Sequence, residues 1–130
     1  MSKNQEMQRS FHSEISPGAE PVYSELQGDK ILMSLLEQYG EQLAESLVLL
    51  GAALEICDFA AARSICHQAR GSARTYGYRD LTIHLETIES SACDGFPPGE
   101  LKLLMRSVLR LADRIQHGIV ITMLKNGHPP

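Results

Sequence analysis

The sequence predicts an all-α fold: an antiparallel up-down-up-down four-helix bundle with a short additional helix at its N-terminal end. Apolar residues recur every three or four positions from residue 29 to about residue 115, the period of amphipathic helices. No segment alternates apolar and polar residues between hairpin turns, so there is no candidate strand. Short connections between the helical segments favour antiparallel neighbours. We expect the domain at residues 24–124, between a flexible leader (1–23) and a C-terminal tail (125–130).

The first two helices are expected at about 29–39 and 41–56. Asp29 is placed to cap the first helix, because its carboxylate can accept hydrogen bonds from the backbone N–H groups of the first turn. Gly40 is expected to separate the two helices. The second helix carries an apolar stripe at helical spacing, formed by Leu43, Leu47, Leu50, Gly51 and Leu54.

The third helix is expected at 58–76, with Asp58 as its N-cap and Gly77 as its C-terminal stop. Its inward stripe consists of Ala62, Ile65, Cys66, Ala69, Ala73 and Tyr76. A turn of about three residues leads to the fourth helix, expected at about 79–92. This short turn predicts that the third and fourth helices lie next to each other.

The last helix follows the longest run of turn residues in the domain, 93–99. Pro98 is tolerable near its start, since the first N–H groups of a helix have no partner within the helix. Gly118 is a possible end, although the apolar period continues through Ile119–Leu124. The helix is therefore expected to stop at Gly118 or to extend beyond it.

Composition narrows the class of protein. The 130 residues hold 12 Lys and Arg against 16 Asp and Glu, a net charge of −4, with 43% hydrophobic residues. This indicates one soluble globular domain with no basic surface for nucleic acid or anionic lipid. No apolar run reaches the 18 or so residues that span a bilayer, and the first twenty residues hold no secretory signal. We expect a cytoplasmic protein.

The cysteines argue against a metal site or a disulfide framework. Their number is odd and none forms a C-x-x-C pair, so reduced thiols are expected at Cys57, Cys66 and Cys93. Three of the histidines, His12, His117 and His128, have no partner at metal-ligand spacing. No metal or other cofactor is therefore expected in this chain.

The third helix carries the candidate chemistry. On a helical wheel His67 points away from the apolar stripe. An exposed imidazole is a nucleophile toward phosphorus, and the phosphoryl group that it acquires adds nearly two negative charges. The same sector of the helix holds no acidic residue but carries three arginines and a glycine: Arg63, Arg70, Gly71 and Arg74. Arginine stays charged and donates in a fork that fits phosphate oxygens.

Two neighbours of His67 are assigned candidate roles. Gln68, at the rim of the sector, is placed to orient a phosphate oxygen or to touch a partner, and a solvated side chain explains it equally well. Gly71 costs roughly 1 kcal/mol relative to alanine in an exposed helix interior. The missing side chain would let another protein's backbone approach His67 closely, although a tolerated defect or a helix contact also fits. In the fourth helix, His84 lies beside the core stripe, and a half-buried structural role is expected.

The segment from Cys66 to Ala73, C-H-Q-A-R-G-S-A, resembles the A-H-x-L-K-G-S-[AS] motif of the histidine-containing phosphotransfer (HPt) domain family. His67 falls on the phosphoacceptor of that motif. The likeness continues without a gap through the glycine that closes the helix and through the Ile88-Glu89 pair at the family's Leu-Glu position. It covers roughly residues 24–115. The departures are Cys66 for Ala, Ala69 for Leu and Arg70 for Lys, of which the last keeps the charge and changes its geometry.

The resemblance implies a phosphorelay intermediate of two-component signalling. His67 would accept a phosphoryl group from the phospho-aspartate of one receiver domain and pass it to a second receiver, with Arg70, Arg74 and Gln68 near the phosphoryl oxygens. The implied partners are response-regulator receiver domains and a hybrid sensor histidine kinase. Magnesium would belong to the receiver. The chain itself would act as a monomer without catalytic activity of its own.

The receiver is expected to cover His67 and an apolar patch beside it, for which Leu36, Tyr39 and Leu43 are candidates that also fit the core. Two other functional classes stay open. A helical adaptor would dock a signalling protein on this face and use His67 as a contact rather than as a nucleophile. A free-standing phosphatase or metal-dependent hydrolase fits less well, since the sequence offers no metal cluster and no Ser–His–Asp arrangement.

Overall fold

The computed structural model describes residues 20–93 and 98–125. Within these ranges the only regular elements are helices, which confirms the all-α class. These helices are α2 (Lys30–Ser34), α3 (Leu36–Glu55), α4 (Phe59–Thr75), α5 (Arg79–Cys93) and α6 (Pro98–Lys125). None of the helices in the described ranges is long and apolar enough to cross a membrane.

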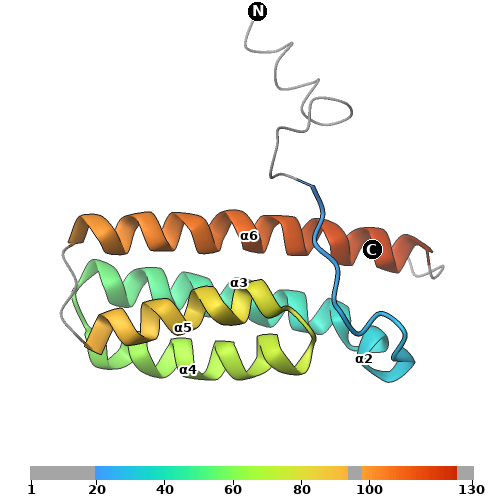
Figure 1. Ribbon diagram of the computed structural model, residues 1–130, viewed down its shortest axis with the longest axis horizontal. Coiled ribbons are helices and arrows are strands. Elements are labelled where there is room, and N and C mark those ends of the chain that lie inside the picture. The colour runs from blue at the N-terminus through green and yellow to red at the C-terminus, as the bar shows by residue number, and fades with distance from the viewer. Residues whose placement is uncertain (1–19, 94–97, 126–130) are drawn as a thin grey trace, which may run out of the picture.

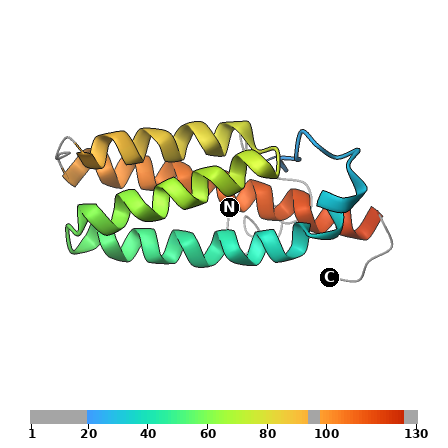
Figure 2. The same ribbon diagram turned by 90° about the horizontal axis from the view of Figure 1, so that it is seen from below.

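The four long helices lie side by side along the longest axis of the molecule (Figures 1 and 2). Each packs against two others: α3 and α5 both contact α4 and α6, and the most extensive contact joins α4 to α5. The short helix α2 lies at one end, against α3. The apolar faces enclose a single core whose largest fully buried side chains are Leu36, Tyr39, Leu50, Cys66, Leu81, Leu85, Ile88, Val108 and Ile115.

The predicted break at Gly40 is wrong. Asp29 caps α2 as expected, accepting from the N–H groups of the first turn, but that helix already ends at Ser34. Helix α3 begins at Leu36 and passes through Gly40 without interruption. Gly40 is needed for the contact between α3 and α6. Nε2 of Gln116 on α6 donates to the carbonyl oxygen of Gly40 at 2.8 Å, and a Cβ atom on Gly40 would lie 2.7 Å from Gln116 Oε1. Gly40 therefore allows α6 to approach α3 closely.

The signals around α4 act as predicted. The carboxylate of Asp58 accepts from the N–H of Ala61 at 3.1 Å and caps the helix. Gly77 ends the turn after α4 with φ of 80°, a left-handed conformation that suits glycine. Helix α5 begins only two residues later. This tight turn places the outward face of α4 beside α5.

The segment before α2 is fastened to the helices, so the prediction of a flexible leader is wrong for residues 20–23. Val22 N–H donates to the Arg114 carbonyl at 2.9 Å, and Arg114 Nε donates to the carbonyl of Glu20 at 2.9 Å. The backbone of Val22 lies so close to Gly118 that a Cβ atom there would collide with it. Gly118 thus admits a crossing segment and does not end α6, which runs to Lys125. The rest of the predicted leader and the tail from residue 126 lie outside the described residues.

Candidate functional site

His67 lies on the solvent side of α4, as the helical wheel predicts. Its side chain is 67% exposed, whereas its neighbours at the inward positions, Cys66 and Ala69, are buried. Asp58 and Gly77 set the two ends of this helix. Burial of its inward stripe, which consists of Ala62, Cys66, Ala69 and Ala73, turns residue 67 outward. The imidazole is therefore accessible to another macromolecule while its backbone is held in a rigid element.

One nitrogen of the imidazole is held by protein groups. Nδ1 lies 2.9 Å from Nη2 of Arg70, one turn along α4, and 3.3 Å from Oε2 of Glu89 on α5. Among the described residues no hydrogen bond involves Nε2. The ring is thus oriented through Nδ1, and Nε2 is left for chemistry or for a partner.

Arg70 connects His67 to two carboxylates of α5. Its Nη1 lies 3.3 Å from Oε2 of Glu86, and its Nε lies 3.1 Å from Oε1 of Glu89. The Nε and Oε1 atoms are buried and attract as charges, but the N–H direction does not form a hydrogen bond. With Nη2 on His67, every nitrogen of the guanidinium faces one partner. Arg70 is a fixed part of the site rather than a free surface cation.

The two carboxylates are what the sequence reasoning missed. The outward sector of α4 itself holds no acidic residue, as the sequence shows, but α5 supplies Glu86 and Glu89, and both contact Arg70. These residues are three apart, which places them on one face of α5. That spacing, together with the three-residue turn after α4, is the signal in the sequence that points to the contact.

Burial removes Cys66 as a competing nucleophile. Its side chain is fully buried next to His67 in the chain, and desolvation, followed by the negative charge of Glu89, raises the pKa of the Cys66 thiol to about 12. A thiol with this pKa stays protonated at neutral pH, and the thiolate is the reactive form. His67 is therefore the nucleophile that the site offers to solvent.

The other predicted site residues on α4 line the neighbouring surface without touching the imidazole. Gly71 is exposed, and a Cβ atom added there would meet nothing within 4 Å. Arg63, Gln68 and Arg74 form no hydrogen bond or ion pair with His67 within the described ranges. Arg74 borders a shallow hollow of about 310 Å³ that also includes Glu86. The structure therefore joins Arg70 to His67 and leaves the other polar candidates nearby.

The prediction that Leu36, Tyr39 and Leu43 offer an apolar patch to a partner is wrong. They are 1%, 2% and 3% exposed, because they form the inward stripe of α3. The ring of Tyr39 stacks on Tyr76 at 4.5 Å between centroids and on Tyr78 at 5.5 Å. Its buried hydroxyl has no hydrogen-bond partner among the residues that the structure describes. Desolvation, followed by the neighbouring tyrosines, raises the pKa of this phenol.

An exposed apolar side chain of α3, Leu49, lies near Gln68 and Ser72 of α4. Leu49 is 59% exposed and borders a hollow of about 250 Å³ together with Gln68 and Ser72 of α4. Its position on the outer side of α3 was not predicted, because the stripe pattern draws attention to the inward residues. Leu49 is therefore an exposed apolar residue close to Gln68, the residue that follows His67 in α4.

His84 has the structural role predicted for it. It is half-buried, and its Nδ1 lies 2.7 Å from the carbonyl oxygen of Asp80, one turn earlier in α5. This bond assigns the proton to Nδ1. In the part of the chain that the structure describes, no group of three or more His, Cys, Asp or Glu side chains is arranged to hold a metal ion.

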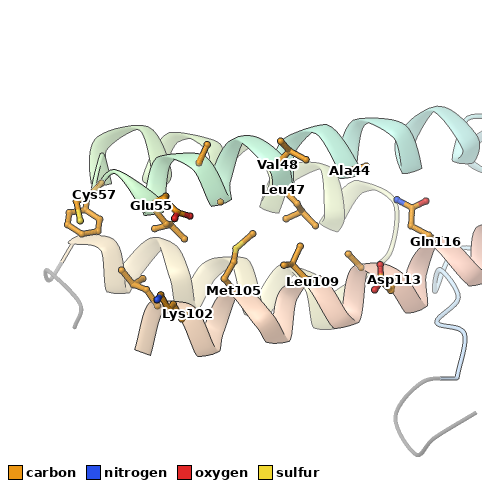
Figure 3. Close-up of a pocket in the computed structure, with 16 residues that line it drawn as sticks. Ala44, Leu47, Val48, Glu55, Cys57, Lys102, Met105, Leu109, Asp113 and Gln116 are labelled. Carbon is orange, nitrogen blue, oxygen red and sulfur yellow. The ribbon is translucent and has the colours of Figure 1, made fainter. Parts of the chain in front are cut away.

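A separate groove lies mainly between α3 and α6 (Figure 3). It has a volume of about 730 Å³ and apolar walls that include Leu47, Val48, Met105 and Leu109. Its lining includes Phe59 at the start of α4, but not His67 or the residues that contact the imidazole. The groove contributes no group to the candidate site.

Comparison of the chain with protein-family models, with curated proteins and with solved structures finds no significant match. The geometry around His67 and the residue pattern of α4 and α5 are therefore the basis for assigning a function.

Proposed function

We propose that this protein is a phosphocarrier of the histidine phosphotransfer type: an antiparallel up-down-up-down four-helix bundle that accepts a phosphoryl group on His67 and passes it on. The observation that carries the proposal is the state of the imidazole. Its side chain is 67% exposed, its Nδ1 is engaged by Arg70 and Glu89, and its Nε2 has no partner among the described residues. A ring that is oriented through one nitrogen and open at the other is suited to nucleophilic attack inside a partner's active site.

In the proposed transfer, the Nε2 lone pair forms an N–P bond while the P–O bond to the donor's aspartate breaks. The aspartate leaves as a carboxylate, and the proton on Nδ1 stays on the ring, so the step neither consumes nor releases a proton. The phosphorylated ring carries a positive charge. Glu89 Oε2, 3.3 Å from Nδ1, is placed to accept the Nδ1–H bond and to balance that charge.

Cations and open space around His67 support the same proposal. Arg70 and Arg74 are candidates to meet phosphoryl oxygens on the side facing the partner, with Gln68 beside them. Arg63 and the open position at Gly71 belong to the surface that the partner would approach, as does the exposed side chain of Leu49. Attack on phosphorus needs little covalent chemistry from the protein beyond orientation and charge balance.

The proposed partners are receiver domains of response regulators and of a hybrid sensor histidine kinase, which supply the aspartate and the magnesium ion. The chain would work in the cytoplasm as a monomer and would have no turnover of its own. It would need no cofactor, because the energy of transfer resides in the acyl phosphate of the donor. These assignments follow from the proposed transfer and from the residue pattern around His67.

The direct test is phosphoryl transfer from a phosphorylated receiver domain carrying labelled phosphate. The full chain is expected to become labelled, and His67→Gln is expected to lose the label while its affinity for the receiver is kept. His117→Gln is the matched control, since His117 is an exposed histidine on α6 and its loss is expected to leave labelling unchanged. Label on nitrogen is lost in acid and kept in base.

Two results would contradict the proposal. Labelling of His67→Gln at the level of the wild type would place the phosphoryl group elsewhere. Binding of receivers without any labelling of the wild type would favour the adaptor, in which His67 serves only as a contact.

A further inference from the structure

Nδ1 of His67 has two partners that require opposite states of the ring. To accept from Arg70 Nη2 at 2.9 Å, Nδ1 must be unprotonated, and the proton of the neutral ring is then on Nε2. To donate to Glu89 Oε2 at 3.3 Å, Nδ1 must carry that proton, and Nε2 then has a free lone pair. A single nitrogen cannot satisfy both partners at once, so the position of Arg70 selects the tautomer.

The shorter contact belongs to Arg70. In the arrangement that the structure describes, Nη2 is 0.4 Å nearer to Nδ1 than Oε2 is, and an N–H donor at 2.9 Å is at the usual length of a hydrogen bond. This arrangement favours the tautomer with the proton on Nε2. The lone pair needed for attack on phosphorus is then absent, and the site is at rest.

Glu86 is the residue that holds Arg70 in this position from the solvent side. Its Oε2 lies 3.3 Å from Nη1, and its side chain is 49% exposed. Glu89 contacts the same guanidinium at Nε, but its Oε2 also competes with Arg70 for Nδ1 of His67. Glu89 therefore has a contact in the site in both tautomers of the ring. Among the described residues Glu86 forms no hydrogen bond or ion pair with the imidazole, so it acts on the ring through Arg70.

We infer that Glu86 is a positioning residue: it holds Arg70 across Nδ1 of His67 and keeps the ring in the resting tautomer until a partner draws the guanidinium away. When Arg70 leaves Nδ1, the proton moves from Nε2 to Nδ1 through solvent, Glu89 accepts the new Nδ1–H bond, and Nε2 gains its lone pair. The second half of this inference depends on the proposed function, since the phosphoryl group is the anion that would compete with Glu86 for Arg70.

The tautomer can be measured directly and without any partner. We suggest ¹⁵N–¹H correlation spectra of the histidine rings in the full chain at alkaline pH, where the ring is neutral, with His67→Gln used to assign the signals. The wild type is expected to show His67 mainly protonated at Nε2. Glu86→Gln is expected to raise the ratio of the Nδ1–H to the Nε2–H form by roughly two- to fivefold, the range that a partly exposed ion pair supports.

Glu55→Gln is the matched control. It removes the same charge from the end of α3, on the groove shared with α6, and is expected to leave the ratio unchanged. A wild-type ring already protonated at Nδ1 would overturn the inference, and so would equal ratios in Glu86→Gln and the wild type. A shift in both Glu variants would also overturn it, because the effect would then come from net charge.

The tautomer spectra, taken together with the phosphoryl-transfer test, separate this inference from the proposed function. Phosphorylation of His67 with an unchanged tautomer ratio in Glu86→Gln would keep the phosphocarrier and remove the role of Glu86. The expected shift of the ratio in a protein that receivers never phosphorylate would keep the role of Glu86 in the ring's state and remove the phosphocarrier.

Discussion

Replacement of Gly71 by alanine is expected to stabilise the fold and to slow phosphoryl transfer. Gly71 lies in the interior of α4, and a Cβ atom built there meets nothing within 4 Å. The added methyl group therefore brings neither a clash nor a new contact within the domain. What remains is the difference in helix propensity, about 0.8–1 kcal/mol in favour of alanine. For a domain of this size that difference raises Tm by roughly 3–6 °C.

The slower phosphoryl transfer is expected to arise where the receiver contacts this surface. Gly71 is one turn beyond His67 on the same face, so a methyl group there stands between the imidazole and an approaching receiver. A packed interface that must accommodate an extra methyl group loses about 1–3 kcal/mol, which corresponds to a decrease of roughly fivefold or more in the transfer rate.

Urea denaturation and the transfer assay should be run on both Gly71→Ala and Gly51→Ala. Gly51 is the matched control because it lies inside α3, where a Cβ atom would have only an ordinary contact of 3.8 Å with Met105 Cε. Both variants should gain stability, and only Gly71→Ala should lose transfer. A Gly71→Ala protein that transfers at the wild-type rate would refute the idea that the missing side chain serves the partner.

The remaining predictions concern the fold and the reactivity of its thiols. Gly118→Ala is expected to lower the free energy of unfolding by about 1–3 kcal/mol, because its Cβ atom would collide with the backbone of Val22; an unchanged urea midpoint would mean that the crossing segment is not held there. In native protein, a thiol reagent followed by mass spectrometry should modify the exposed Cys57 and Cys93 and spare Cys66. Because the pKa of Cys66 rises from 9.0 to about 12 on folding, its contribution to stability is complete below about pH 9 and is lost as the pH rises toward 12. Cys66→Ala should flatten this alkaline loss, and an equally steep loss in that variant would contradict the assignment.

Local signals in the sequence determined the helices and the direction of His67. The caps at Asp29 and Asp58, the stop at Gly77 and the rotation of residue 67 away from the core all depend on residues within one or two turns of one another. Such interactions are formed inside a single helix and can be recognised from spacing alone.

The tertiary structure decided which glycines interrupt a helix and which only permit contact. Gly40 and Gly118 both lie inside helices, where they allow close approach by Gln116 and by Val22. A glycine has the same pattern in the sequence whether it ends a helix or faces a neighbour. The difference lies in what packs against it, and that neighbour is 76 residues away along the chain in the case of Gly40.

In the candidate site, too, some features follow from local sequence and others from contacts between helices. The sequence by itself placed His67 and Arg70 on one face of one helix, since they are three residues apart. Only the packing of α4 on α5 decided that Glu86 and Glu89 reach the guanidinium and that Nδ1 has two competing partners. Likewise, the packing of α3 decided that Tyr39 belongs to the core. Contacts between helices depend on the rotation and register with which they meet, and these are set by the shape of the whole core rather than by the period of any one helix.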